Sequence, residues 1–439
     1  MSGGWADRKI HFVGAGGAGM SGLALAVLEL GASVTGSDRD RSSYLERLEA
    51  AGIEITVGHD AANVPDGAEV VLSSAIGDDN PEVLAARDAG LRILHRSELL
   101  SEACRGRQVV AVAGTHGKTT TTAMVAWVLR SLGIDSAFFV GGEVPDLGPG
   151  GTPTNASWSG EGPVVVEADE SDGSFLRLDP TVAVVTNLEM DHHANWDGMA
   201  ALRKAFAEFV TGVGTAVLPG ADPATAFLDG LASETVTFDL DGPGPEALVL
   251  KVPGRHNLLD ARAALAALQA IGVESDGAAA ALADFPGVSR RLEFRGEMGG
   301  IPVYDDYAHH PTEIAATLSA AREVVGEGRL VVAFQAHHYY RTAMFLREFG
   351  EALGLADAVV VLEIFAPGEV PIPGASGQTM AAHIPLDPQD VVFEPSWSAV
   401  AGHLAARARP GDIVMTLGAG DIGMVAVEVL DLLRGADRQ

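Results

Sequence analysis

The chain has 439 residues, of which 47% are hydrophobic and 20% charged, and it carries a formal net charge of -30. This length corresponds to two or three domains of ~150 residues, and the hydrophobic share is that of a globular protein with a large core. The acidic surplus argues against binding a nucleic-acid backbone, which requires a basic surface. Local cations and backbone N–H groups must therefore attract any anionic ligand.

Cys104 is the only cysteine, which excludes an internal disulfide and favours a reducing compartment. We expect it to be a small core residue. The polar residues 1–9 lack the apolar core of a signal peptide. Apolar runs such as residues 23–28 fall short of the ~20 residues that span a bilayer. The sequence thus predicts a cytoplasmic protein without a membrane segment.

Short apolar, β-rich runs alternate with helical patterns along the chain, which predicts α/β domains with mainly parallel sheets. The first unit has strands within residues 9–19, 33–38, 69–76 and 92–96, and a helix over 20–31. The second has strands within 108–120, 163–171 and 181–193, and helices over 119–133 and 257–272. The third has strands within 301–311, 329–342, 358–365 and 412–421.

The predicted domains cover residues 1–106, 107–286 and 287–439. The stretch 283–291 is a predicted linker, because Pro286 and Gly287 interrupt regular structure. Residues 142–163 are rich in glycine and proline, and we interpret them as a surface loop.

Residues Gly14 to Gly19 (GAGGAG) fit the pattern G-x-G-x-x-G between a strand and a helix, and Asp38 ends the next strand. In that setting the glycines allow close backbone approach, the helix N-terminus attracts a phosphate, and the acid binds a ribose hydroxyl. The motif indicates a diphosphate ligand rather than NAD in particular. The alternative is a tight turn with a purely structural role.

Residues 114–119 (GTHGKT) form a predicted phosphate-binding loop between a strand and a helix. Backbone N–H groups would surround the phosphates, Lys118 would reach the β- and γ-phosphate oxygens, and the Thr119 hydroxyl would bind Mg²⁺. The first glycine of the common pattern is replaced by Val112. The alternative is a glycine-rich turn that carries a surface lysine.

Two acidic stretches follow strands of the same unit, at residues 167–172 (EADESD) and 187–193 (NLEMDHH). In a parallel sheet both emerge at the carboxyl edge beside the phosphate loop. Carboxylates and an imidazole beside a triphosphate favour a divalent-metal site. The alternative is a solvated acidic surface. In the third unit, DDYAHHP and FQAHHYYRT place histidines and an arginine at two strand ends, which predicts a further site there.

These motifs identify a family resemblance. GAGGAGMSG, GTHGKTTTT, EADESDGSF, VVTNLEMDHH, PGRHNLLDARAAL, RRLEFRG and DDYAHHPTEI occur in the order and context of the Mur ligases, over nearly the whole chain. The phosphate loop is common to that family and to the folylpolyglutamate synthetases. GAGGAGMSG together with DDYAHHP resembles the branch that adds L-alanine to UDP-N-acetylmuramate.

The resemblance implies a Rossmann-like UDP-binding domain, a central P-loop ATPase-type α/β domain and a C-terminal Rossmann-like domain that binds the amino acid. It also implies an ATP-dependent amide-bond-forming ligase of peptidoglycan precursor synthesis, with Mg²⁺ or Mn²⁺. ATP would convert the muramyl carboxylate to an acyl phosphate, which the amine of L-alanine would attack. The enzyme would be a monomer or homodimer with no nucleic-acid or membrane partner.

The resemblance also assigns site residues, with Lys118, His309 and Arg341 as the catalytic ones. The UDP substrate would contact Gly14, Gly16, Gly17, Gly19, Met20, Ser21, Asp38, Ser73 and Arg96. ATP would contact Gly114, Thr115, His116, Gly117, Lys118, Thr119, Thr120, His256, Asn257 and Asp260. The metal would bind Thr119, Glu167 and His192, and L-alanine would bind Tyr307, His309, His337 and Arg341.

The chain departs from the family pattern at three positions. Ala336 replaces a proline and His338 an arginine, and Asp260 replaces an asparagine near the expected adenine contact. The position that is a carbamylated lysine in some sister ligases corresponds to Phe206, which agrees with the alanine-adding branch.

Three other functions compete with this interpretation. A recycling ligase would add a whole peptide to UDP-N-acetylmuramate and share the first two domains. An NAD-dependent oxidoreductase would explain Gly14 to Gly19 but leave Lys118 and Glu167 without a role. A non-catalytic nucleotide-binding relative would have no reason to retain Lys118, Glu167 and Arg341 together.

Overall fold

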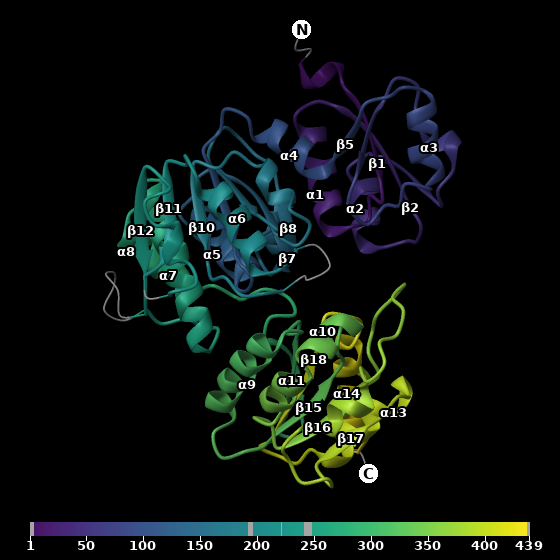
Figure 1. The fold of residues 1–439 in the computed structure, drawn as a ribbon, viewed down its shortest axis with the longest axis vertical. Coiled ribbons are helices and arrows are strands. Elements are labelled where there is room, and N and C mark those ends of the chain that lie inside the picture. Colours follow the sequence, from purple (N-terminus) through teal and green to yellow (C-terminus); the bar gives the residue numbers. More distant parts are fainter. Residues whose placement is uncertain (1–3, 192–195, 221, 241–247, 437–439) are drawn as a thin grey trace. The chain divides into compact units, whose positions relative to one another are not determined.

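The computed structural model describes residues 4–191, 196–220, 222–240 and 248–436. It contains three β-sheets, which the chain completes one after another (Figure 1). The first two domains form one compact unit, and the third forms a second unit together with Asp191 and residues 249–259. The predicted three-domain α/β fold is therefore confirmed. Among the described residues, no helix is both long and apolar enough to span a bilayer.

The first domain is built on a five-stranded parallel sheet with the order β3-β2-β1-β4-β5. The strand order reverses between β1 and β4, and in such sheets ligands bind outside the carboxyl ends of the strands at that point. Its elements are β1 Lys9–Val13, α1 Ala18–Glu29, β2 Ser33–Asp38, α2 Ser43–Ala50, β3 Glu54–Val57, β4 Glu69–Leu72, α3 Pro81–Asp88, β5 Ile93–His95 and α4 Arg96–Cys104.

Cys104 at the end of α4 lies in the core of the first domain, where it is 5% exposed. Burial raises the pKa of its thiol to about 12. The expectation of a packed core cysteine is confirmed.

The central domain has a seven-stranded sheet with the order β12-β11-β10-β6-β9-β7-β8, in which only the β7–β8 pair is antiparallel. Both β9 and β10 are neighbours of β6, so the segments that follow these three strands emerge side by side. Its elements are β6 Val109–Ala113, α5 Lys118–Ser131, β7 Ala137–Val144, β8 Thr154–Ser157, β9 Val164–Glu167, β10 Val182–Val185, α6 Met199–Val210, β11 Thr215–Pro219, β12 Glu234–Phe238, α7 Arg255–Ala270 and α8 Ser275–Leu282.

The prediction of a surface loop over 142–163 is wrong in part. β7 extends to Val144, and β8 adds an edge strand that packs on α1 of the first domain. Asn155 donates a hydrogen bond from Nδ2 to the carbonyl of Ala18 at 3.1 Å, and a Cβ on Gly22 would lie only 2.5 Å from the Cβ of Ala156. The glycine and proline content masked this strand, which is stabilised by contacts with the neighbouring domain.

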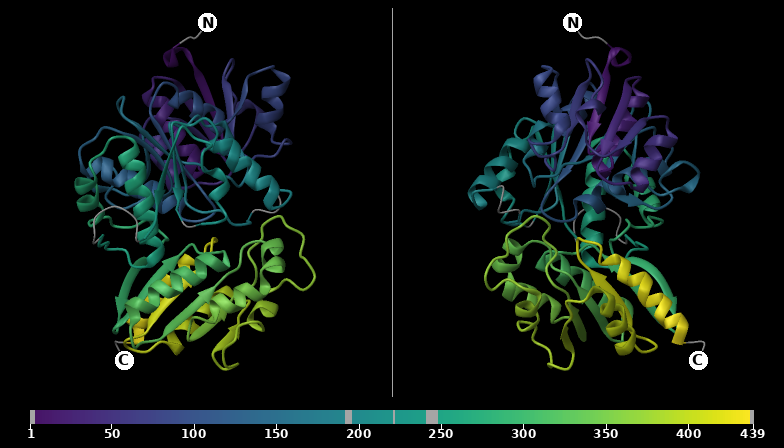
Figure 2. Two further views of the ribbon diagram at one scale, coloured as in Figure 1. Left: turned by 60° about the vertical axis from the view of Figure 1, so that its left-hand side comes forward. Right: turned by 90° about the vertical axis from the view of Figure 1, so that its right-hand side faces the viewer.

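The third domain has a six-stranded sheet with the order β13-β14-β18-β15-β16-β17, parallel except for the β13–β14 pair. Separate apolar clusters fill its two faces, one with α9 and α11 and one with α13 and α14, and Figure 2 shows α14 in yellow along the sheet. Its elements are β13 Glu293–Met298, β14 Ile301–Asp306, α9 Pro311–Val325, β15 Leu330–Phe334, α10 Tyr339–Met344, α11 Leu346–Leu353, β16 Ala358–Val361, α12 Gly377–Ala381, β17 Val391–Phe393, α13 Trp397–Arg407, β18 Ile413–Leu417 and α14 Gly423–Ala436.

The predicted linker over 283–291 is irregular, since α8 ends at Leu282 and β13 begins at Glu293. Phe285 and Val288 within it are nevertheless buried, at 0% and 3% exposure. Both side chains are therefore part of the packing of the second unit.

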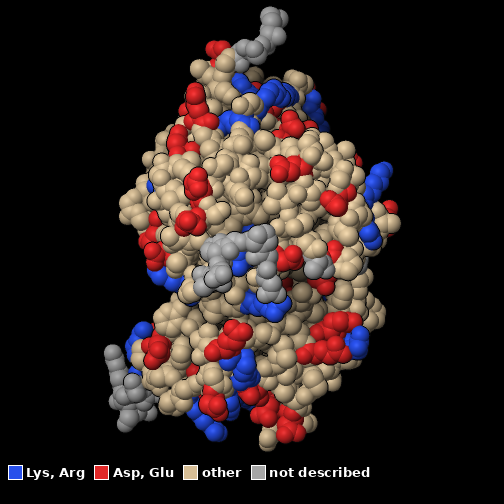
Figure 3. Space-filling view, turned by 90° about the vertical axis from the view of Figure 1, so that its left-hand side faces the viewer, with Lys and Arg blue, Asp and Glu red and all other residues tan. Residues whose placement is uncertain are grey.

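The surface carries both signs of charge. On the face in Figure 3, acidic side chains are scattered with basic ones between them, and the described residues there form no extended basic patch.

Candidate active site

The phosphate loop connects β6 to α5 with a backbone that requires glycine at two places. Gly114 and Gly117 have φ values of 131° and 79°. Residues with a Cβ rarely adopt such positive φ values. A Cβ on Gly114 would lie 2.1 Å from Thr186 Oγ1, and one on Gly117 would lie 2.3 Å from Asp260 Oδ1. The strand–loop–helix prediction is confirmed, and the loop fits closely against its neighbours.

The loop is held by the segment that follows β10, as the strand order requires. The backbone N–H of His116 donates to Asn187 Oδ1 at 2.9 Å, and its Nε2 lies 2.8 Å from Glu189 Oε2. The Thr115 hydroxyl donates to the carbonyl of Glu189 at 3.0 Å. The second acidic stretch therefore supports the loop as well as contributing polar side chains. Thr120 is buried in the first turn of α5.

Lys118 is not a surface lysine, because its side chain is only 12% exposed. Its Nζ donates to the carbonyls of Gly114 at 2.7 Å and Thr115 at 3.2 Å and lies 2.9 Å from Glu170 Oε2. Burial lowers the pKa of this ammonium, but Glu170 and Asp169 raise it, so its pKa lies above its ordinary value. The group is a fixed positive charge at the start of α5.

Glu167 and Thr119 lie side by side at the ends of β9 and the phosphate loop. The Thr119 hydroxyl donates to Glu167 Oε1 at 2.9 Å, and Gly141 N donates to Oε2 at 2.6 Å. Burial raises the pKa of Glu167, although Lys118 opposes the rise. His192, the third predicted metal ligand, lies outside the described residues.

These groups fit a hard divalent cation. A hydroxyl and a carboxylate are oxygen donors of the kind that Mg²⁺ prefers, and Glu167, Asp169 and Glu170 surround a single ammonium. The surplus of negative charge at this buried site would be offset by a cation together with its phosphate ligands.

The glycine-rich loop of the first domain lies at the point where its strand order reverses. Gly14 has a φ of 77°, and the backbone N–H of Gly16 donates to Asp38 Oδ2 at 2.7 Å. A Cβ on Gly19 would lie 2.5 Å from Arg96 Nη1. The N-terminus of α1 and the guanidinium of Arg96 therefore both lie beside this loop, and both groups attract a diphosphate.

The other predicted UDP-binding residues frame the same loop. Met20 and Ser21 are buried in the first turn of α1, and Gly17 is the N-cap of that helix. Ser73 follows β4, the neighbour of β1 on the other side of the reversal point. The structure therefore brings together residues from the ends of β1, β2, β4 and β5.

The predicted adenine-binding residues lie in the first turns of α7. Asn257 Nδ2 donates to the carbonyl of Pro253 at 2.6 Å. Burial, followed by the charge of Arg291, lowers the pKa of His256 to about 4. Asp260 is 8% exposed and faces the phosphate loop at Gly117. The carboxylate of Asp260 therefore lies against the phosphate loop itself.

The amino-acid site predicted in the third domain is assembled from the ends of β14 and β15, which flank β18. The rings of His309 and His337 are 6.3 Å apart, and those of Tyr307 and His309 are 5.4 Å apart. Burial lowers the pKa of His309 to about 3, so its imidazole is neutral near pH 7. A neutral imidazole can form hydrogen bonds with an amino acid, but with so low a pKa it is too weak a base to take a proton from an ammonium.

Arg341 is 1% exposed, and its guanidinium is occupied by Asp191. Nε donates to Asp191 Oδ1 at 3.0 Å, and Nη2 donates to Oδ1 and Oδ2 at 2.9 and 3.1 Å. Nη1 lies 3.4 Å from the carbonyl of His337. Arg341 is therefore a member of a buried ion pair, and an anionic ligand would compete with Asp191 for it.

Sequence reasoning did not name two acidic partners that the structure supplies. Glu170 pairs with Lys118, and Asp191 pairs with Arg341. Both lie within the acidic stretches that the sequence singled out, but nothing in the spacing distinguished them from their neighbours.

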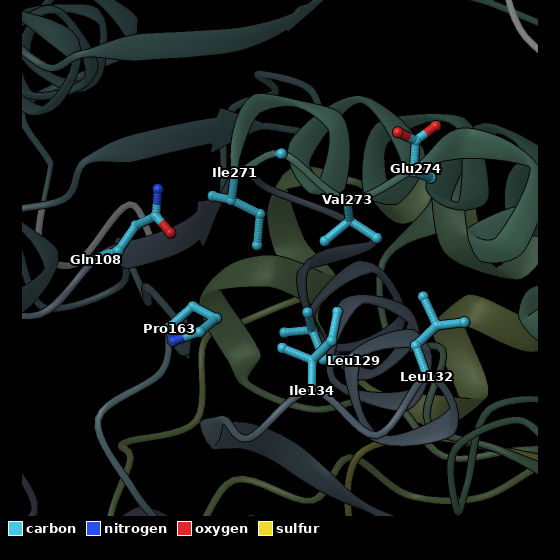
Figure 4. Close-up of a pocket in the computed structure, with 9 residues that line it drawn as sticks. Gln108, Leu129, Leu132, Ile134, Pro163, Ile271, Val273 and Glu274 are labelled. Atoms are coloured by element: carbon cyan, nitrogen blue, oxygen red, sulfur yellow. The ribbon is translucent and has the colours of Figure 1, made fainter.

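The pocket in Figure 4 lies away from these groups. Because Gln108 and Pro163 precede β6 and β9, it is at the amino edge of the central sheet, whereas the phosphate loop is at the carboxyl edge. Among the described residues, its lining includes none of the predicted site residues. The lining consists of Gln108, Leu129, Leu132, Ile134, Pro163, Ile271, Gly272, Val273 and Glu274.

Family models match the three domains in turn. The Mur ligase catalytic domain matches residues 9–108, the Mur ligase middle domain matches 112–244, and the Mur ligase glutamate ligase domain matches 290–420. This chain belongs to the Mur ligase family. The resemblance inferred from the motifs is confirmed, and with it an ATP-dependent ligase that forms amide bonds.

Individual Mur ligases resemble the chain over almost its whole length. The UDP-N-acetylmuramate–L-alanine ligase of Acidothermus cellulolyticus is 47% identical over 97% of this chain and 95% of that protein. The crystal structure of the UDP-N-acetylmuramate–alanine ligase of Thermotoga maritima has a TM-score of 0.82 at 32% identity, and the match covers 98% and 99% of the two chains. A murein peptide ligase from Psychrobacter arcticus has a TM-score of 0.68 at 26% identity, over 97% and 98%.

Proposed function

We propose that this enzyme joins L-alanine to the carboxylate of UDP-N-acetylmuramate at the expense of ATP, in peptidoglycan precursor synthesis. The full-length similarity to alanine-adding ligases carries this proposal. The murein peptide ligase is less similar in both sequence and fold, so the peptide-recycling activity is the weaker candidate. The buried Lys118 and the carboxylates around it have no role in an NAD-dependent oxidoreductase.

The site residues divide the reaction between them. The glycine-rich loop and Arg96 bind the diphosphate of the UDP substrate. The phosphate loop binds ATP, and Lys118 stabilises the γ-phosphoryl group during its transfer to the muramyl carboxylate. His309 and His337 bind the amino acid, and its deprotonated amine attacks the acyl phosphate. Phosphate is then released.

A divalent cation, Mg²⁺ or Mn²⁺, is part of this proposal. When bound, it would neutralise phosphate charge and orient the γ-phosphoryl group. Thr119 and Glu167 would hold it, with His192 as the third ligand. The oxygen donors of Thr119 and Glu167, 2.9 Å apart, support this assignment.

We propose that domain limits lie at residues 106/107 and 286/287, that the enzyme acts in the cytoplasm as a monomer or homodimer, and that it has no nucleic-acid or membrane partner. Light scattering of the purified protein checks the oligomeric state directly.

The test of the reaction is ADP release with UDP-N-acetylmuramate, measured across L-amino acids and the tripeptide L-alanyl-γ-D-glutamyl-diaminopimelate. We expect release with L-alanine and none with the tripeptide. Release with the tripeptide alone would replace the proposal with the recycling activity.

The glycine-rich loop should bind the UDP sugar and not NAD. Calorimetry should show heat of binding with UDP-N-acetylmuramate and none with NAD(H). Arg96→Ala should weaken binding ~10-fold or more, since a charge-assisted hydrogen bond contributes about 1.5–3 kcal/mol. Arg39→Ala, at an exposed arginine in the same domain, is the control. Equal affinity for both ligands would refute the diphosphate-sugar assignment.

Arg341 should serve the amino-acid step alone. Arg341→Ala should lower kcat/KM for L-alanine ~10²-fold, in the range found for lost electrostatic stabilisers, while the Kd for UDP-N-acetylmuramate stays unchanged. Arg341→Lys should restore little, because a point charge cannot replace a planar bidentate fork.

Folding must be checked for these variants, since Arg341→Ala leaves Asp191 buried without its counter-ion. Asp191→Asn added to Arg341→Ala should restore the melting temperature but not the ligation rate. Normal ligation by Arg341→Lys would show that the fork geometry is not required.

A further inference from the structure

The turn that begins α10 is strained at His338. This residue has φ 72° and ψ 130°, outside the regions that residues with a Cβ ordinarily occupy. Such a conformation persists only where surrounding contacts hold it.

Glu369, on the segment between β16 and α12, holds this turn with both carboxylate oxygens. Oε1 contacts Nδ1 of His338, and Oε2 accepts a hydrogen bond from the backbone N–H of Tyr339 at 2.9 Å. The same segment bonds the turn through its backbone. The N–H of His338 donates to the carbonyl of Phe365 at 3.2 Å, and the N–H of Phe365 donates to the carbonyl of Ala336 at 2.8 Å.

The turn separates two residues assigned to the amino-acid site. His337 immediately precedes it and stacks on the Phe365 ring at 5.8 Å. Arg341 lies one helical turn after His338 and approaches the carbonyl of His337 at 3.4 Å. The backbone conformation at His338 therefore determines the positions of the His337 and Arg341 side chains.

We infer that Glu369 is a positioning residue for the L-alanine site: it stabilises the strained turn at His338 and thereby orients His337 and Arg341. It need not touch the amino acid itself. The inference rests on the proposed function, in which His337 and Arg341 serve L-alanine.

The test compares Glu369→Ala with the double variant Glu369→Ala/His338→Gly. Glu369→Ala should raise KM for L-alanine ~10-fold or more, because small misplacements of binding groups have large kinetic effects. KM for ATP and for UDP-N-acetylmuramate should stay within about twofold. Glycine adopts positive φ without a Cβ penalty, so the double variant should recover most of the loss.

Glu394→Ala is the matched control. Glu394 lies in the same domain and likewise contacts one histidine, His403 at 3.0 Å, and one backbone N–H, that of Ser396 at 2.9 Å. It should leave all three KM values unchanged. A Glu369→Ala enzyme whose KM values all change alike along with a lower melting temperature, or one that His338→Gly does not rescue, would overturn the positioning role.

His337→Ala separates this inference from the proposed function. If His337→Ala leaves KM for L-alanine unchanged, the amino-acid site is misassigned. If His337→Ala raises KM for L-alanine and Glu369→Ala does not, the site assignment holds and the role of Glu369 is refuted.

Discussion

Lys118→Ala should lower kcat for ligation by at least ~10²-fold, the range observed when an enzyme loses one electrostatic stabiliser of a developing charge. The ammonium is fixed by the carbonyls of Gly114 and Thr115 and by Glu170, so it needs no reorganisation when phosphoryl transfer begins. Steady-state ADP release at saturating substrates measures the effect.

The same variant should also lose stability, and this effect can be separated from catalysis. Burial already raises the pKa of Glu170 to about 7, and removal of the ammonium leaves that carboxyl buried without a partner. Adding Glu170→Gln should restore the melting temperature but not turnover. Lys204→Ala, at an exposed lysine of α6, should change neither. Near-normal turnover of Lys118→Ala would remove the basis for the phosphate-loop assignment.

Chelation by EDTA should abolish ligation, and either Mg²⁺ or Mn²⁺ should restore it, because both ions prefer oxygen ligands such as those of Thr119 and Glu167. Glu167→Gln removes a charged ligand, so it should raise the metal concentration needed for half-maximal rate ~10-fold or more. Titration of the apoenzyme with each metal measures that concentration.

Glu208→Gln, an exposed carboxylate of the same domain, is the control and should titrate like the unaltered enzyme. Ligation that persists in EDTA at the original rate would show that the carboxylates serve another purpose. An unchanged metal requirement in Glu167→Gln would exclude this residue as a ligand.

Local sequence signals were sufficient to predict those parts of the site whose residues are neighbours along the chain. The loops at Gly14 to Gly19 and Gly114 to Thr119 were predicted with their flanking strands and helices. Positive φ values, helix N-termini and buried strands each require particular residue types at adjacent positions, and these are visible in the sequence. The parallel-sheet rule also placed the segments after β9 and β10 beside the phosphate loop, and the strand order agrees. The edge strand β8 was missed because contacts with another domain outweigh its local composition.

The sequence by itself determined the three α/β domains, the family and the residue types at each strand end. Only the tertiary structure decided which acid contacts which basic side chain: Glu170 contacts Lys118, Asp191 contacts Arg341 and Glu369 contacts His338. The acid of the Arg341 pair lies 150 residues away along the chain. Periodicity and motif spacing indicate the conformation of residues that are neighbours in the sequence. An ion pair depends instead on the approach of side chains from distant segments, and tertiary packing determines which segments come together.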